Sequence, residues 1–253
     1  MLIARGDEVI GIFAETMREV AMLKGMEMGE ITVSSGIYPA DISVASAIGA
    51  LITQHPRLLV QLDVKRWPEV YEDVAQGRAD IGVADATEAV HRPDLAIEPI
   101  RESRLFFFCR SGHPLLRRPS LSLEDILEHP WAGPQIPAPM RLHIPLLERG
   151  FGAVDAETNL LRPRVLTHTF PAAKEVVLAG DAISAALPSQ ISRELADGSC
   201  ALIPLDLPWL KVSYGFITKR GRSLSPAGTA FKELLLAVEN RADRLAEAAA
   251  RHG

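Results

Sequence analysis

The sequence predicts an α/β protein built from two successive strand–helix series. Segments that alternate apolar and polar residues are separated by segments with helical spacing, a pattern typical of parallel βαβ units. The pattern occurs twice along the chain, and no low-complexity linker divides the two series. No repeat with a period of about 20 to 50 residues is present. Two lobes of this kind commonly enclose a ligand-binding cleft.

The first 28 residues are predicted to form a linker helix. Within residues 7–24 the apolar side chains recur at helical spacing, and Gly25 is suited to end a helix. The apolar stripe of this helix needs a partner. It either packs on its own domain or pairs with another subunit.

The first strand–helix series follows from Glu30 onward. Pro68 is suited to a first helical position, and Gly77 to a helix end. The predicted elements are a strand at 30–34, a helix at 39–53, a strand at 58–64, a helix at 68–77, and strands at 80–84, 95–100 and 104–110.

The second series begins after a short helix, which Ser122 and Asp125 introduce with the spacing of a capping box. Ser225 and Pro226 start the last helix as an N-cap followed by proline. The predicted elements between them are a strand at 164–166, a helix at 171–179, a strand at 182–187, a helix at 189–195 and a strand at 211–219.

Composition and motifs exclude several classes of function. The 253 residues carry a net charge of -5, whereas a chain that binds DNA by itself usually has a basic surplus. The sequence contains none of the GxSxG, HExxH, GxxxxGK[ST] or GxGxxG motifs, and its histidines lack metal-ligand spacing. We therefore expect no enzymatic activity, catalytic residue, cofactor or metal site.

The N-terminus and the cysteines indicate the compartment. No secretory signal is recognisable, and the longest apolar runs are too short to span a bilayer. Cys109 and Cys200 are far apart in the sequence, and neither belongs to a CxxC motif. We expect a cytoplasmic protein without membrane association, with Cys109 an inert thiol in an apolar strand.

Six segments, in this order, resemble the effector-binding domain of LysR-type transcriptional regulators. They are spread over nearly the whole chain and lie at 29–33, 52–56, 70–83, 109–115, 176–188 and 218–231. The segment at 109–115 contains His113-Pro114-Leu115, which looks like the HPL segment of that family. Each segment is a weak signal alone, and together they make a strong case.

The resemblance implies a periplasmic-binding-protein-like fold (type 2), with two Rossmann-like lobes joined by two crossing strands. Lobe I would comprise 29–108 plus 216–253, and lobe II 109–215. The family senses a small-molecule effector in the inter-lobe cleft, where binding shifts the population of lobe arrangements. It assembles as a dimer or tetramer, here through the helix at 40–53 and the strand at 58–64 facing the helix at 171–179 of a partner subunit.

The N-terminus departs from the family pattern. LysR-type regulators carry an N-terminal winged helix-turn-helix of roughly 60 residues, then a linker helix. Here the predicted linker helix begins almost at Met1. We therefore expect this chain to lack the DNA-binding part, so that contact with DNA would require a missing N-terminal domain.

The effector is expected at loops beyond the carboxyl ends of the strands. Ligands bind there in open α/β sheets, and helix N-termini with nearby hydroxyl groups favour a small carboxylate. The candidate effector-binding residues are Ser34, Ser35, Tyr38, Arg66, Trp67, Asp85, Thr87, Gln135, Thr167, His168, Thr169 and Phe170.

Several of these residues have two interpretations. Ser34 and Ser35 cap the following helix, donate hydroxyl hydrogen bonds to an effector carboxylate, or do both, and Thr167 and Thr169 share these alternatives. His168 is either a solvated loop residue or a ligand contact.

Three residues of lobe I are also ambiguous. The resemblance places a small hydroxyl residue at the position of Trp67. A tryptophan there could stack on a ring or sugar face, fill a narrow cleft, or pack on the lobe surface. Arg66 either pairs with a carboxylate or is solvated. Asp85 is either a solvated acid or a partner for an effector hydroxyl or amine.

Three classes of function compete for this sequence. The family-like segments favour the effector-binding module of a cytoplasmic LysR-type transcription regulator. A solute-binding protein of a transport system shares the fold, but the absent signal and the linker-like first helix argue against it. An enzyme is disfavoured because no nucleophile is paired with a base.

Overall fold

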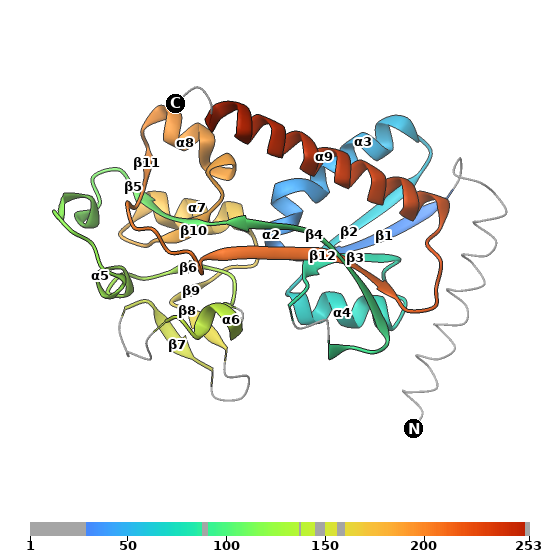
Figure 1. Cartoon of the computed structure of the whole chain (residues 1–253), viewed down its shortest axis with the longest axis horizontal. Coiled ribbons are helices and arrows are strands. Elements are labelled where there is room, and N and C mark those ends of the chain that lie inside the picture. The colour runs from blue at the N-terminus through green and yellow to red at the C-terminus, as the bar shows by residue number, and fades with distance from the viewer. Residues whose placement is uncertain (1–28, 88–90, 137, 145–149, 156–159, 251–253) are drawn as a thin grey trace. The chain divides into compact units, whose positions relative to one another are not determined.

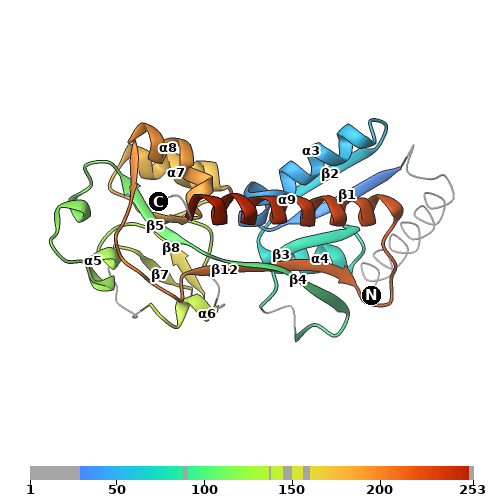
Figure 2. The same cartoon turned by 45° about the horizontal axis from the view of Figure 1, so that its top comes forward.

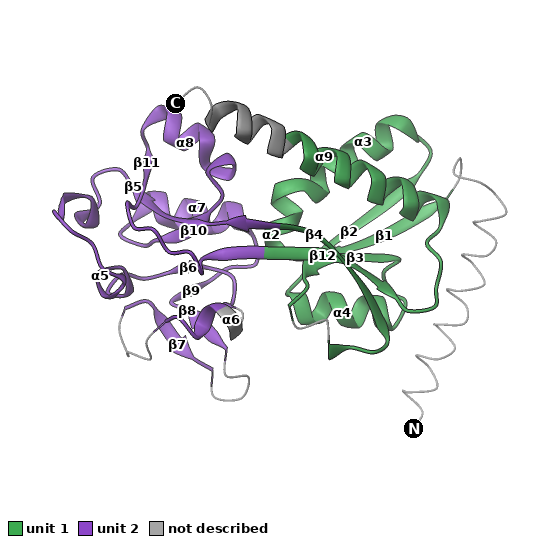
Figure 3. Cartoon of the chain, in the orientation of Figure 1, with its two compact units in different colours: residues 1–101, 213–253 green, residues 102–212 purple. Residues whose placement is uncertain are grey.

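The computed structural model describes residues 29–87, 91–136, 138–144, 150–155 and 160–250, with only the backbone described at 138–139 and 242–250. The predicted linker helix at 1–28 lies outside the described residues. The chain divides into two compact units, residues 1–101 with 213–253 (unit 1) and residues 102–212 (unit 2), as Figure 3 shows. The lobe boundaries expected from the sequence lie a few residues further along the chain.

Unit 1 is built on a five-stranded sheet with the order β2-β1-β3-β12-β4 (Figure 1). β1 pairs in parallel with both β2 and β3, as the first strand–helix series predicted, and β12 pairs antiparallel with β3. The strands are β1 (Glu30–Ser35), β2 (Leu59–Val64), β3 (Ile81–Asp85), β4 (Leu95–Arg104) and β12 (Lys211–Lys219).

Helices flank this sheet. The chain is helical without a break from Ile37 to Gln54, two residues earlier than predicted, and a π-helical stretch lies in the middle. α3 packs against α9, which runs beside it in Figure 2. The helices are α2 (Ile37–Pro39), η2 (Ala40–Val44), α3 (Ala45–Gln54), α4 (Trp67–Ala75) and α9 (Pro226–Ala250).

The core of unit 1 follows the periodicity of its elements. Ile31 and Val33 alternate on β1 and are fully buried, together with Leu51 of α3 and Phe231 of α9. α4 approaches β3 so closely that a Cβ on Gly82 would lie 2.9 Å from Val70 Cγ1. A larger residue at this position would push the helix off the sheet.

Unit 2 contains a three-stranded sheet, with the order β10-β5-β11, and two pairs of short strands. β5 pairs antiparallel with both neighbours, and among the described residues of unit 2 parallel pairing is limited to β6 with β9 and a bridge between Trp131 and Ile183. The second series is therefore less regular than its strand–helix alternation suggested. The strands are β5 (Phe106–Arg110), β6 (Ala132–Gly133), β7 (Gly152–Val154), β8 (Leu161–Pro163), β9 (Val165–Leu166), β10 (Ser184–Ala186) and β11 (Cys200–Leu202).

The helices of unit 2 are short. The capping box predicted before α5 is present, because the Asp125 N–H donates to Ser122 Oγ (3.3 Å) and the Ser122 N–H to Asp125 Oδ2 (2.8 Å). The helix predicted at 189–195 is divided into a 3-10 turn and α8. The helices are η4 (Pro114–Arg117), α5 (Leu123–Leu127), α6 (Ala138–Arg141), α7 (Phe170–Ala179), η5 (Pro188–Ile191) and α8 (Ser192–Asp197).

Cys109 and Cys200 lie on the neighbouring strands β5 and β11, and both are buried free thiols. Cys200 is opposite Arg110 in the ladder, so the two thiols are one register position apart and point to opposite faces of the sheet. Burial raises the pKa of Cys109 to about 12, as expected of a thiol in an apolar strand. No helix among the described residues is long and apolar enough to cross a bilayer.

Candidate functional site

Parallel pairing in unit 1 places the ends of three strands at one edge of the sheet. Ser35 is in register with Val64 of β2 and Val83 of β3. The Lys65 N–H donates to Ser35 O (2.9 Å), and the Gly36 N–H donates to Val83 O (2.8 Å). We call this the unit 1 edge, and it comprises residues 34–38, 65–67 and 85–87. The structure therefore brings together the loops that the sequence singled out in the first series.

Ser34 and Ser35 are fully buried at the unit 1 edge. Ser34 Oγ donates to Asp73 Oδ2 (3.0 Å), and Ser35 Oγ donates to Gly36 O (3.0 Å). The N-cap of the following helix is Gly36, without a side-chain cap. The capping interpretation is thus wrong for both serines. Their hydroxyl protons are used inside unit 1.

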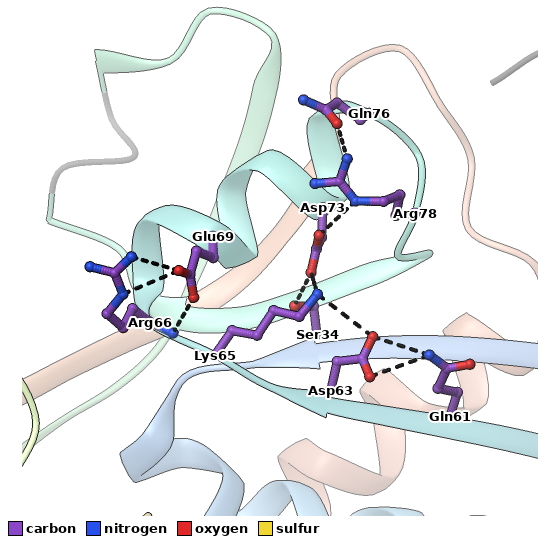
Figure 4. Close-up of polar contacts among 9 residues, drawn as sticks. All are labelled: Ser34, Gln61, Asp63, Lys65, Arg66, Glu69, Asp73, Gln76 and Arg78. Carbon is purple, nitrogen blue, oxygen red and sulfur yellow. Dashed lines mark hydrogen bonds and ion pairs between the residues drawn. The ribbon is translucent and has the colours of Figure 1, made fainter. Parts of the chain in front are cut away.

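Asp73 of α4 is the centre of a charged network at this edge (Figure 4). Its Oδ2 accepts from Lys65 Nζ (2.7 Å) as well as from Ser34, and its Oδ1 accepts from Arg78 Nε (2.9 Å). The Asp73 side chain is only 4% exposed, while that of Lys65 is 35% exposed. Burial raises the pKa of Asp73, but the hydrogen bonds from Lys65, Arg78 and Ser34 outweigh burial and hold the pKa below its usual range.

Arg66 precedes α4 and is paired with Glu69. Its guanidinium lies 2.6 Å from Glu69 Oε1, and its backbone N–H donates to Glu69 Oε2 (3.3 Å). The hydrogen bond from Arg66 lowers the pKa of Glu69. Trp67, the first residue of α4, is 7% exposed. Its side chain is therefore almost completely covered, with little surface free for stacking.

The loop after β3 contains the other candidates of unit 1. Asp85 is half-buried, and its Oδ1 accepts from the Thr87 N–H (2.8 Å), while its carbonyl accepts from the Tyr71 hydroxyl. Tyr38 on α2 is half-buried, and burial raises the pKa of its phenol. Asp85 shapes its own loop as an Asx turn and is not a freely solvated acid.

A second edge forms in unit 2, where β6 and β9 pair in parallel and end together. The Thr167 N–H donates to Gly133 O (2.9 Å), which joins the two loops that follow these strands. We call this the unit 2 edge, and it comprises residues 133–136 and 167–170. Gln135 is half-buried and His168 exposed. The structure again brings together candidates that are distant in sequence.

α7 begins at the unit 2 edge, and Thr169 caps it. Thr169 Oγ1 accepts from the Ala172 N–H (3.4 Å), so the capping interpretation is confirmed for Thr169. Thr167 Oγ1 instead donates to Thr169 O (3.3 Å) and does not cap the helix. Phe170 is buried, with its ring centroid 6.3 Å from that of Phe108.

The two edges differ in charge. At the unit 1 edge, Lys65 and Arg66 are each paired with a carboxylate. The residues of the unit 2 edge carry no carboxylate, lysine or arginine, and among the described residues no group of histidine, cysteine or acidic side chains is arranged to hold a metal ion.

Lys65 and Asp73 are not among the effector-binding residues expected from the sequence. An acid at position 73, on the apolar face of α4 beside Val70 and Val74, was a signal of a buried ion pair.

Comparison with known proteins gives matches over nearly the whole chain. Residues 24–239 match the model of the family described as the LysR substrate binding domain. A transcriptional activation protein for SDS degradation from Pseudomonas sp. (strain ATCC 19151) is 30% identical over 88% of this chain and 71% of its own length. The HTH-type transcriptional regulator GbpR of Azospirillum brasilense is 25% identical over 98% of this chain and 71% of its own length.

Solved structures show the same fold. The effector-binding domain of QuiR in complex with shikimate has a TM-score of 0.59 and 16% identity, and the match covers 85% of this chain and 98% of that one. The regulatory domain of Synechocystis PCC6803 CcmR in complex with 2-PG has a TM-score of 0.61 and 17% identity, with 83% and 97% covered.

Proposed function

This chain belongs to the LysR substrate-binding domain family of transcriptional regulators, and we propose that it binds a small carboxylate-bearing effector through residues of the unit 1 edge and the unit 2 edge. The observation that carries the proposal is the parallel strand pairing, which gathers the candidate loops at one edge in each unit. Ligands of open α/β sheets bind at such edges. Since the relatives are regulators, a solute-binding protein of a transport system is not supported.

The N-terminus of α7 supports a carboxylate. This helix has ten residues, so its first N–H groups carry a partial positive charge that favours anions. Pro171 has no N–H, and the N–H groups of Ala172 and Ala173 donate to Thr169 Oγ1 and Thr169 O (3.4 and 3.3 Å), so the support comes from the partial positive charge of the helix end. At the unit 1 edge, a carboxylate would have to compete with Asp73 for Lys65 and with Glu69 for Arg66.

We propose that the chain holds its effector without converting it, in the cytoplasm where transcription regulators act. The relatives regulate transcription, which supports binding and not catalysis. Recovery of the compound unchanged after incubation with the protein tests this point. A consumed compound would contradict it.

The experiment is the melting temperature of the purified protein against benzoate, shikimate, amino acids, sugar acids and a short-chain alkyl sulfate. The alkyl sulfate is included because the relative from Pseudomonas is a transcriptional activation protein for SDS degradation. A ligand at 100 times its Kd stabilises by about 2.7 kcal/mol, which for a chain of this size raises the Tm by roughly 5 to 10 °C.

A matched pair of glutamine variants places the ligand. Gln135→Ala at the unit 2 edge should reduce the ligand-induced shift, whereas Gln76→Ala, at the exposed C-terminus of α4, should leave it unchanged. A shift that is equal in both variants would contradict binding at the unit 2 edge. The absence of a shift with every compound would contradict the carboxylate proposal.

We also propose that α3 and β2 form a subunit interface with α7 of a partner. β2 is an edge strand, and Ile52 of α3 and Leu59 of β2 are large apolar side chains that are 45% and 68% exposed. Edge strands with exposed apolar residues are natural pairing surfaces. Leu59→Glu should shift the sedimentation coefficient toward that of a monomer, and an unchanged value would contradict this interface.

A further inference from the structure

Two buried polar atoms in unit 2 have no hydrogen-bond partner among the described residues and lie beside the same glycine. They are Trp131 Nε1 and Ser184 Oγ. A Cβ placed on Gly133 would lie 2.7 Å from the indole nitrogen and 3.7 Å from the hydroxyl oxygen. The two atoms come from adjacent parallel segments, which the Trp131–Ile183 bridge joins. Both atoms therefore lie next to the same position beside Gly133, which distinguishes them from isolated unpaired groups.

The Trp131 indole has little freedom to turn its N–H toward another partner. Phe107 and Phe151 contact it edge-to-face, with ring centroids 5.1 and 4.6 Å away, and Trp131 itself is 2% exposed. Ser184 is fully buried on β10, opposite Phe108. Buried donors are normally paired, so an unpaired donor in a native fold calls for a partner outside the protein.

Gly133 places this polar pair at the unit 2 edge. It is the last residue of β6, and its carbonyl accepts from the Thr167 N–H at 2.9 Å. Half-buried Pro134 and Gln135 follow it. At 2.7 Å a Cβ would be too close to the indole nitrogen, so glycine keeps the side of the N–H free of carbon.

The chemistry of the pair selects the partner. An indole N–H can only donate, and a serine hydroxyl can donate to the same atom, so the group between them is an acceptor oxygen. We propose that Trp131 and Ser184 form an oxygen-binding subsite for the effector, which takes a carboxylate or hydroxyl oxygen. The inference rests on the proposed function and deepens it, since it names donors of the site that are uncharged and buried.

The first test needs no ligand and compares two buried serines. Ser184→Ala removes an unpaired hydroxyl, so the Tm of the ligand-free protein should stay equal or rise by about 2–4 °C. Ser34→Ala is the control, because it removes a hydroxyl that donates to Asp73, and its Tm should fall. A fall in Tm for Ser184→Ala as large as for Ser34→Ala would overturn the inference.

The second test follows the indole N–H of Trp131 by ¹H–¹⁵N NMR. The chain has three tryptophans, so the resonance is assigned by its absence from the spectrum of Trp131→Phe. Acetate, benzoate and shikimate are titrated separately, and at least one should shift this resonance to saturation. Ser184→Ala should weaken that binding by about three- to tenfold, the loss of one neutral hydrogen bond.

Three results of this titration would also overturn the inference. They are the absence of a saturable shift with all three probes, an equal Kd for Ser184→Ala, and a long-lived water at the indole N–H that each probe leaves in place. A rise in Tm with a probe that leaves the Trp131 resonance unmoved would refute the subsite while the proposed function survives. If neither the three probes nor the other compounds of the panel change the Tm or the Trp131 resonance, both fail.

Discussion

The unit 1 edge and the unit 2 edge occupy equivalent positions at the ends of parallel strands, yet they differ in the polar groups that lie in and beside them. At the unit 1 edge, Lys65, Arg66 and Ser34 are bound to carboxylates of the same unit. Beside the unit 2 edge, next to Gly133, Trp131 Nε1 and Ser184 Oγ are buried without a partner among the described residues. The difference suggests that the unit 1 edge stabilises its own loops, whereas the unit 2 edge reserves donors for a ligand.

The largest expected effect concerns the network of unit 1. Lys65→Ala should lower the free energy of unfolding by about 2–4 kcal/mol, because buried Asp73 loses a charged partner. Arg66→Ala is the control. Its pair with Glu69 is 41% and 46% exposed, so the loss should stay below about 1 kcal/mol. Urea unfolding measures both, and equal losses would contradict the structural role of Lys65.

Gly133→Ala sharpens the comparison from the side of unit 2. The added methyl group would lie 2.7 Å from Trp131 Nε1, so we expect a loss of about 1–3 kcal/mol in unfolding free energy. Gly49→Ala on α3 meets no atom within 4 Å and should stabilise by up to about 1 kcal/mol. Thermal unfolding that shows no difference between the two variants would argue against close packing at Gly133.

Thr169→Ala tests the cap of α7. Loss of the hydrogen bond from the Ala172 N–H should destabilise by about 1 kcal/mol, seen as a Tm lower by roughly 2–4 °C. Thr167→Ala removes a hydroxyl that makes no cap and should change stability by less than about 0.5 kcal/mol. The reverse order of effects would refute the assignment of the cap.

The smallest expected effect is the dependence of stability on pH that Asp73 of unit 1 contributes. The pKa of Asp73 is lowered in the folded state, so its ionised form stabilises the protein above about pH 4, the pKa of an unfolded aspartate. That stability is lost as the pH falls through the folded pKa. The stability difference between wild type and Asp73→Asn should therefore shrink as the pH falls below about 4.

Ser184→Ala supplies the contrast for this titration, because it changes an uncharged group of unit 2. Its stability difference from wild type should be the same at each pH. Thermal scans of the three proteins across the acid range measure both quantities. A stability difference for Asp73→Asn that stays constant with pH would show that Lys65, Arg78 and Ser34 do not stabilise the ionised Asp73 carboxylate.

Much of the fold was predictable from periodicity. The parallel strands of unit 1 and the capping box at Ser122 follow from local patterns that tertiary packing did not override. The antiparallel pairing of β5 with β10 and β11 was not predictable, because short apolar strands carry no signal of direction. For the same reason the second series suggested a more regular sheet than unit 2 contains.

The candidate loops were predictable because strand ends and helix starts can be read locally. The use of each side chain was not. Whether Ser34 caps a helix or donates to Asp73 depends on a residue 39 positions away. The close approach of the Trp131 and Ser184 side chains to Gly133 has no signal in the sequence. Such contacts are set by packing between distant segments, which one sequence does not reveal.

The central claim is that the effector is bound at the unit 1 edge and the unit 2 edge. Its most direct test is a map of backbone and indole chemical-shift changes on ¹⁵N-labelled protein, recorded with the compound of the panel that raises the Tm most. We expect the largest changes at Gly133–Gln135, Thr167–Phe170 and the Trp131 indole, with smaller changes at Arg66 and Trp67. Changes centred on α3, β2 or α9, or no saturable change at either edge, would contradict the account.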